Sequence, residues 1–151
     1  MIIFINGPFG VGKSTVAEKL HEAIPNSLIF DPEEVGSLLG KVLAKIDPKP
    51  DFQEYALWPK LSVEVAGHLK REYGRDLIIP MTLYDVGRFN QVVKGLRTVD
   101  SDFHHFCLLA APQTILYRIS DRTSHGARST FYPVLLRSIQ TYLIAGSRPI
   151  R

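Results

Sequence analysis

The chain has 151 residues, of which 45% are hydrophobic and 22% charged, proportions typical of one globular domain. Its formal net charge of +3 is a mild bias toward anionic partners such as nucleotides, and no nucleic-acid-binding motif accompanies it. No segment approaches the roughly 20 apolar residues of a membrane span, and the start lacks the basic leader of a signal peptide, so a cytoplasmic protein is expected. The single cysteine, Cys107, excludes an internal disulfide and is expected to be buried and inert within its apolar run.

Short apolar runs alternate with longer stretches of helical periodicity, and no linker or repeat divides the chain. The near-continuous apolar runs predict strands covered on both faces, at 2–6, 27–30, 76–81 and 104–110. The periodic stretches predict helices, from about 12 to 24, at 32–44, at 57–74, from 112 onward and at 131–142. This alternation predicts βαβ units around a parallel sheet, in a single α/β domain over residues 1–151.

The first expected strand is followed by GPFGVGKS at residues 7–14, which matches the phosphate-loop pattern G-x-x-x-x-G-K-[ST] between a strand and a helix. Glycines allow the backbone N–H groups to face a phosphate, and the helix start adds its positive end. Lys13 is expected to bridge the β- and γ-phosphates, and the Ser14 hydroxyl to bind Mg²⁺. The expected nucleotide contacts are Gly7, Gly10, Val11, Gly12, Lys13, Ser14 and Thr15.

The kind of nucleotide protein follows from the elements that are missing. A GTPase needs D-x-x-G and N-K-x-D, yet no Asp has Gly three residues later and no Asn precedes Lys. A transporter ATPase needs a serine-glycine-glycine signature, which is also missing. A small-molecule or nucleotide kinase remains, in which the protein positions the reactants for phosphoryl transfer.

A kinase that acts on a hydroxyl needs a carboxylate to orient it or accept its proton. Asp31 is the first candidate, because it follows the second strand at the carboxyl end of the sheet, where α/β folds bind ligands. The same DPEE segment also reads as a helix start, with Asp31 as N-cap, Pro32 at the first position and Glu34 in a capping box. Both interpretations remain open, and Asp85, after the third strand, is the alternative carboxylate.

Two arginines share a face of the helix that follows Pro112, since Arg118 and Arg122 are four residues apart. We expect a lid at about 118–131, with Arg122 neutralising the transferring phosphoryl group and Arg118 contacting the nucleotide. The alternative is a solvated helix face, with either arginine paired to Asp121.

The acceptor pocket is expected near the aromatic cluster FQEYALW, residues 52–58, because substrate pockets combine aromatic walls with a few polar groups. Gln53, Trp58 and Thr82 are the candidate substrate contacts, although most aromatic clusters belong to the core. His104 and His105 are neighbours on a strand and so face opposite sides, which excludes joint metal binding.

With GPFGVGKST, DPEEVG, DFQEYALW, IIPMT and HHF, the chain resembles the tunicamycin-resistance proteins, relatives of chloramphenicol phosphotransferase and the nucleotide kinases. The resemblance runs from residue 1 to about 122. It implies a three-layer α/β/α P-loop nucleoside-triphosphate hydrolase fold, a parallel sheet of order 2-3-1-4 and MgATP as donor. It assigns the strand-2 carboxylate to Asp31 and the lid arginines to Arg118 and Arg122.

The tail departs from that family. Residues 124–151 match nothing in it, a fifth strand is expected at 141–145, and the membrane-associating tail of the relatives is not evident. The expected function is ATP-dependent phosphorylation of a small molecule, with tunicamycin-like nucleosides first. The alternatives are an ATP-binding protein that sequesters the antibiotic without chemistry, a nucleoside or nucleotide kinase, and a nucleic-acid-binding ATPase.

Overall fold

The computed structural model contains the whole chain, and the structure describes residues 1–124. Its elements, in chain order, are β1 (Ile2–Asn6), α1 (Lys13–Ala23), β2 (Ser27–Ile29), α2 (Pro32–Leu43), the 3₁₀ helix η1 (Phe52–Glu54), α3 (Leu57–Tyr73), β3 (Asp76–Met81), α4 (Val86–Val99), β4 (Phe103–Cys107) and α5 (Pro112–Ser124). Within that part of the chain, no helix has the length and apolar character needed to cross a membrane.

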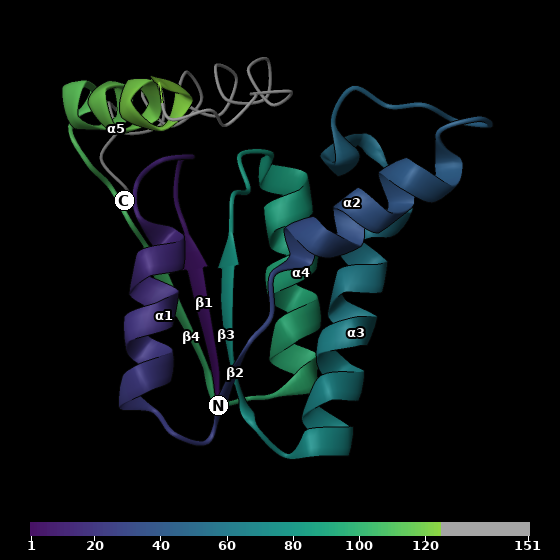
Figure 1. Ribbon diagram of the computed structural model, residues 1–151. Coiled ribbons are helices and arrows are strands. Elements are labelled where there is room, and N and C mark those ends of the chain that lie inside the picture. Colours follow the sequence, from purple (N-terminus) through teal and green to yellow (C-terminus); the bar gives the residue numbers. More distant parts are fainter. Residues whose placement is uncertain (125–151) are drawn as a thin grey trace.

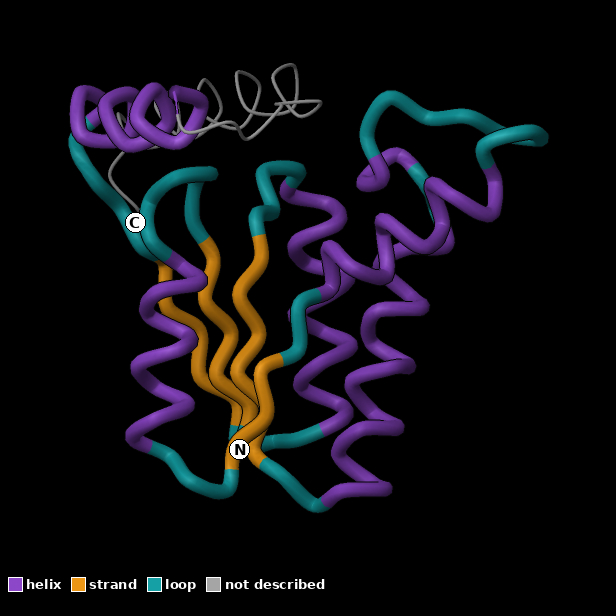
Figure 2. Tube along the Cα trace, viewed as in Figure 1, coloured by secondary structure: helices purple, strands orange, loops and turns teal. Residues whose placement is uncertain are grey.

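All strand pairs in the sheet are parallel, in the order β2-β3-β1-β4 (Figure 2). This confirms the sheet order implied by the family resemblance. Parallel strands place all their carboxyl ends at one edge, so the loops after β1, β2 and β3 lie close together there.

Helices cover both faces of the sheet, with α1 on one side and α2, α3 and α4 on the other (Figure 1). Successive residues of β1 show how the two layers are separated. Ile3 and Ile5 pack against the α1 side, whereas Ile2 and Phe4 belong to the larger core under α2, α3 and α4. A strand buried on both faces needs apolar residues on both, as β1 has from Ile2 to Ile5. The predicted three-layer α/β/α arrangement is therefore confirmed.

Helix α5 lies across the carboxyl edge of the sheet, above the loop that joins β1 to α1 (Figure 1). Its buried residues Ile115 and Ile119 form a small separate core with Phe9 of that loop and Ala110. The helix is thus anchored by apolar contacts to the segment predicted to bind phosphate.

Strand β4 is more exposed than its apolar sequence suggested. It pairs only with β1 and stands at the edge of the described sheet, so its residues from His104 to Cys107 are exposed. The expectation that Cys107 is buried was therefore wrong. His104 and His105 do face different surroundings, because His105 stacks on Phe4 at 5.2 Å while His104 lies 2.9 Å from Asp102. The proposed helix at 131–142 and the fifth strand at 141–145 lie outside the described residues.

Helix α4 was not predicted from the sequence. Gly87, Gly95 and several β-branched residues give this segment weak helix propensity. A local helix cap and a close tertiary contact compensate. The side chain of Asp85 accepts a hydrogen bond from the N–H of Arg88 at the helix start, and Gly95 lies so close to α3 that an added Cβ would come within 2.7 Å of Val63.

Alanine is therefore expected to have opposite effects at two helical glycines. At Gly95 the added methyl group clashes with Val63 at the close α3–α4 contact. The clash lowers the free energy of unfolding by about 1–3 kcal/mol, and the better helix propensity of alanine offsets part of this loss. At Gly40 of α2 an added Cβ meets nothing within 4 Å, so Gly40→Ala raises stability by about 0.5–1 kcal/mol. Thermal unfolding of both variants checks the pair, and a Gly95→Ala variant as stable as Gly40→Ala would contradict it.

Candidate functional site

The loop after β1 has the backbone conformation of an anion-binding turn. Gly10 and Gly12 have φ values of 79° and 108°, in the region that favours glycine. Gly7 approaches the segment after β4 so closely that an added Cβ would lie 2.6 Å from the carbonyl oxygen of Leu108. Asn6, at the end of β1, holds this edge together: its side chain donates to the Leu83 carbonyl at 3.2 Å and accepts from the Leu83 N–H at 2.9 Å.

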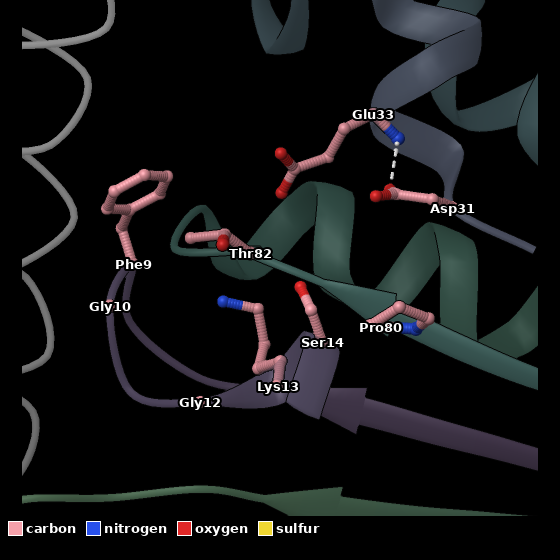
Figure 3. A pocket seen from close by; sticks show the side chains of 9 residues that line it. All are labelled: Phe9, Gly10, Gly12, Lys13, Ser14, Asp31, Glu33, Pro80 and Thr82. Carbon is pink, nitrogen blue, oxygen red and sulfur yellow. Dashed lines mark hydrogen bonds between the residues drawn. The ribbon is translucent and has the colours of Figure 1, made fainter. Parts of the chain in front are cut away.

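Lys13 opens helix α1 and is buried, with its Nζ turned over the loop (Figure 3). The Nζ donates to the carbonyl oxygens of Gly7 and Pro8, both at 3.1 Å. No side chain caps the start of α1, so its positive end is directed at the loop without a neutralising group. The loop therefore offers a cation, a helix N-terminus and backbone amides to an anion, as a phosphate loop does.

A cavity of about 60 Å³ lies over this loop (Figure 3). It is bounded by the phosphate loop, the start of α2 and the end of β3. Its lining residues are Phe9, Gly10, Gly12, Lys13, Ser14, Asp31, Glu33, Pro80 and Thr82. Four of the residues singled out in the sequence, Lys13, Ser14, Asp31 and Thr82, thus line one cavity.

Asp31 occupies both of the places that its sequence suggested. It caps helix α2, since its Oδ1 accepts a hydrogen bond from the N–H of Glu33 at 2.9 Å, and it also lines the cavity. Burial raises the pKa of the Asp31 carboxyl, against the lowering effect of that hydrogen bond and of Lys13. Glu34, expected in a capping box, is exposed.

Glu33 is a cavity residue that the sequence analysis missed. Its carboxylate extends from the first turn of α2 toward Thr82 and the phosphate loop, opposite Lys13 (Figure 3). Burial and the nearby Asp31 raise the pKa of Glu33, whereas Lys13 and Thr82 lower it. The sequence did offer one indication of this role. DPEE has three acidic residues, and one carboxylate suffices to cap the helix.

A larger cavity of about 440 Å³ lies on the other side of the loop, between α1 and α5. Arg118 lines it and donates from a guanidinium nitrogen to the carbonyl oxygen of Val11 at 2.9 Å. Thr15 and Tyr117 also line it. This cavity adjoins the phosphate loop and has room for the nucleoside part of a nucleotide.

Three of the other predicted residues, Trp58, Gln53 and Asp85, do not line either cavity. Trp58 is fully buried, with its indole N–H donating to the Pro32 carbonyl at 2.8 Å, so it supports the start of α2 from within the core instead of lining the cavity. Gln53 is buried behind the wall and donates to the Thr82 carbonyl at 2.9 Å. Asp85 caps α4 and does not line the cavity. Arg122 lies on α5, and the predicted lid beyond Ser124 falls outside the described residues.

The donor set fits a magnesium ion held mainly by nucleotide phosphates. Among the described residues there is no group of three or more His, Cys, Asp or Glu side chains that would hold a metal alone. The Ser14 hydroxyl and the Asp31 carboxylate line the same cavity, and Mg²⁺ is usually bound by one or two protein oxygens together with substrate phosphates. Ser14 is therefore the residue that would hold the ion.

Comparison with known proteins identifies the family. The family model described as an AAA domain matches residues 2–137. Among solved structures, the tunicamycin resistance protein of Deinococcus radiodurans is similar over 96% of this chain and 95% of its own, with 30% identity and a TM-score of 0.67. The chain belongs to the tunicamycin-resistance family of AAA-domain proteins. Membership accounts for the kinase-like P-loop fold and for nucleotide binding as the general property of the site.

More distant structures share the fold of the family. A sugar kinase from a Janibacter species covers 99% of this chain and 79% of its own, with 16% identity and a TM-score of 0.66. A gluconokinase from Sinorhizobium meliloti covers 90% of this chain and 73% of its own, with 17% identity and a TM-score of 0.57. No curated protein matches the chain in sequence.

Proposed function

We propose that this member of the tunicamycin-resistance family is an ATP-dependent phosphotransferase, and that a tunicamycin-like nucleoside is its acceptor. The observation that carries the reaction type is a carboxylate, Asp31, lining the same cavity as Lys13 and Ser14 of the phosphate loop. The acceptor rests on the 30% identity to the Deinococcus protein over nearly the full length of both chains.

In the proposed reaction the acceptor hydroxyl oxygen forms a bond to the γ-phosphorus of ATP, and the bond from that phosphorus to the β–γ bridging oxygen breaks. The products are ADP and the phosphorylated acceptor, and the hydroxyl proton passes to the Asp31 carboxylate. Lys13 would bind the β- and γ-phosphates, and Mg²⁺ held at Ser14 would supply charge neutralisation. Arg118 contacts the nucleotide side of the loop, and Arg122 is proposed to steady the transferring group.

The sequestration alternative shares the nucleotide site and differs only in the fate of the antibiotic. Mass spectrometry of tunicamycin after incubation with the protein and MgATP separates the two. We expect a gain of about 80 daltons, one phosphoryl group, with equimolar ADP. Unchanged tunicamycin that nevertheless stays bound to the protein would favour sequestration and overturn the transferase.

A further inference from the structure

The charge balance of the smaller cavity is unusual for a site built around phosphates. Its nine lining residues include one cation, Lys13, and two carboxylates, Asp31 and Glu33. Lys13 lies in the phosphate loop and is directed at the donor nucleotide. Among the described residues that line the cavity, no cation besides Lys13 is present to bind a phosphate on the acceptor.

Enzymes that recognise a phosphorylated molecule surround the phosphate with Arg or Lys. Arg88, at the start of α4, is the first arginine that follows β3 in the sequence. It lies 3.7 Å from the Asp85 carboxylate and does not line the cavity. The described acceptor side therefore has the opposite charge from the one that a phosphorylated acceptor needs.

The Thr82 hydroxyl belongs to the same wall of the cavity as Glu33 and is compatible with a ligand that donates a hydrogen bond. The Thr82 hydroxyl is buried and lacks a hydrogen-bond partner of good geometry among the described residues, although the Glu33 carboxylate lies near it. A carboxylate only accepts hydrogen bonds, so an acceptor hydroxyl can donate to Glu33, whereas an ionised phosphate can only be repelled by it.

We propose that Glu33 determines acceptor specificity, by admitting hydroxyl-bearing molecules that lack a phosphate group and excluding phosphorylated ones. The inference rests on the proposed function, because it treats the space beside Lys13 as the acceptor side of a phosphotransferase. Glu33 extends into that space from a rigid helix start, where Asp31 caps the helix and Trp58 binds the Pro32 carbonyl. A nucleoside kinase fits this site, and a kinase for nucleoside monophosphates does not.

A probe for this property need not be the acceptor itself. In-line transfer places the acceptor directly beyond the γ-phosphorus of ATP. Adenosine 5′-tetraphosphate carries one more phosphate at that point, so it inserts an anion into the acceptor side. Equilibrium binding of the tetraphosphate and of ATP is measured, each with Mg²⁺ at pH 8. The ratio of the two affinities reports how strongly the acceptor side excludes a phosphate, and no turnover is needed.

We expect the wild-type protein to bind the tetraphosphate at least 10-fold more weakly than ATP. Glu33→Gln should reduce this ratio of affinities at least 5-fold. Glu33→Asp keeps the charge and should retain most of the ratio. Glu34→Gln is the matched control, because it removes the same charge from the next, exposed position and should leave the ratio unchanged. If Glu33→Gln does not fold, as judged by thermal unfolding, Glu33→Ala takes its place.

Each other outcome is decisive. A wild-type protein that binds the tetraphosphate as tightly as ATP overturns the inference and leaves the proposed function intact. If the difference in affinity between ATP and the tetraphosphate is unchanged in Glu33→Gln, or falls equally in Glu34→Gln, Glu33 is not its cause. Failure to bind either nucleotide overturns the proposed function itself, and the inference with it.

Discussion

Lys13→Ala is expected to lower phosphoryl transfer from ATP by on the order of 10³-fold or more, because a charged donor in a preorganised site stabilises the charge of the transferring group. Lys13 is the cation among the residues that line the cavity over the loop, and it is buried. An alanine leaves the loop with its backbone amides and the N-terminus of α1. ADP release in the presence of tunicamycin, followed at saturating MgATP, measures the loss.

Lys45→Ala is the control for this variant, since it removes the same charge from an exposed position after helix α2. The Lys13 variant also loses two hydrogen bonds to the loop, so its thermal unfolding must be compared with that of the wild type. A folded Lys13→Ala protein with wild-type turnover would show that the loop does not bind the reacting phosphates.

The phosphate loop was predictable from the sequence because everything that defines it is local. Three glycines, a lysine and a hydroxyl residue lie within eight positions between a strand and a helix, and the structure gives Gly10 and Gly12 the positive φ values that this turn requires. The sheet order followed from the family resemblance, and the strand positions from continuous apolar runs.

Other features depend on contacts between distant segments, and the sequence pattern does not contain them. Helix α4 is stabilised by the packing of Gly95 against Val63 of α3, which is invisible in a sequence window that shows only a poor helix former. Trp58 looked like a pocket residue because aromatic clusters serve pockets and cores alike. Its complete burial and its hydrogen bond to the Pro32 carbonyl assign it to the core.

The direction of the Glu33 side chain also could not be predicted from the sequence. A helix start with three acids is common, and the sequence says that one of them caps the helix without saying where the others point. The direction of Glu33 depends on the angle at which α2 leaves the sheet, which Trp58 and η1 fix from the other side. The specificity of the site is thus determined by core packing as much as by its lining residues.

Asp31→Asn should separate the two roles of Asp31. Asparagine is as good an N-cap as aspartate, so helix α2 should form normally, while the group that accepts the hydroxyl proton is lost. We expect transfer to fall about 10²–10⁴-fold, with ATP binding within about 3-fold of the wild type. Turnover and nucleotide binding, measured on the same preparation, check both halves of this result.

The pH dependence of kcat/KM tests independently whether Asp31 accepts the hydroxyl proton. Burial raises the pKa of Asp31 above its ordinary value of 3.8, so the ionised form that can accept a proton is lost at a higher pH than for an exposed aspartate. The wild-type kcat/KM should fall on the acid side through that raised pKa, and the residual activity of Asp31→Asn should lack this limb.

Stability should change in the opposite sense from activity. Above pH 3.8 an unfolded chain releases the Asp31 proton while the folded protein still holds it, so the stability contributed by this group declines as the pH rises through the folded pKa. Asp31→Asn should therefore be at least as stable as the wild type at pH 8, whereas Asp31→Ala, which loses the cap, should lose about 1 kcal/mol relative to Asp31→Asn. An Asp31→Asn protein with full turnover and an unchanged acid limb would leave Asp31 as a helix cap only, and the proton would then have to pass to another group.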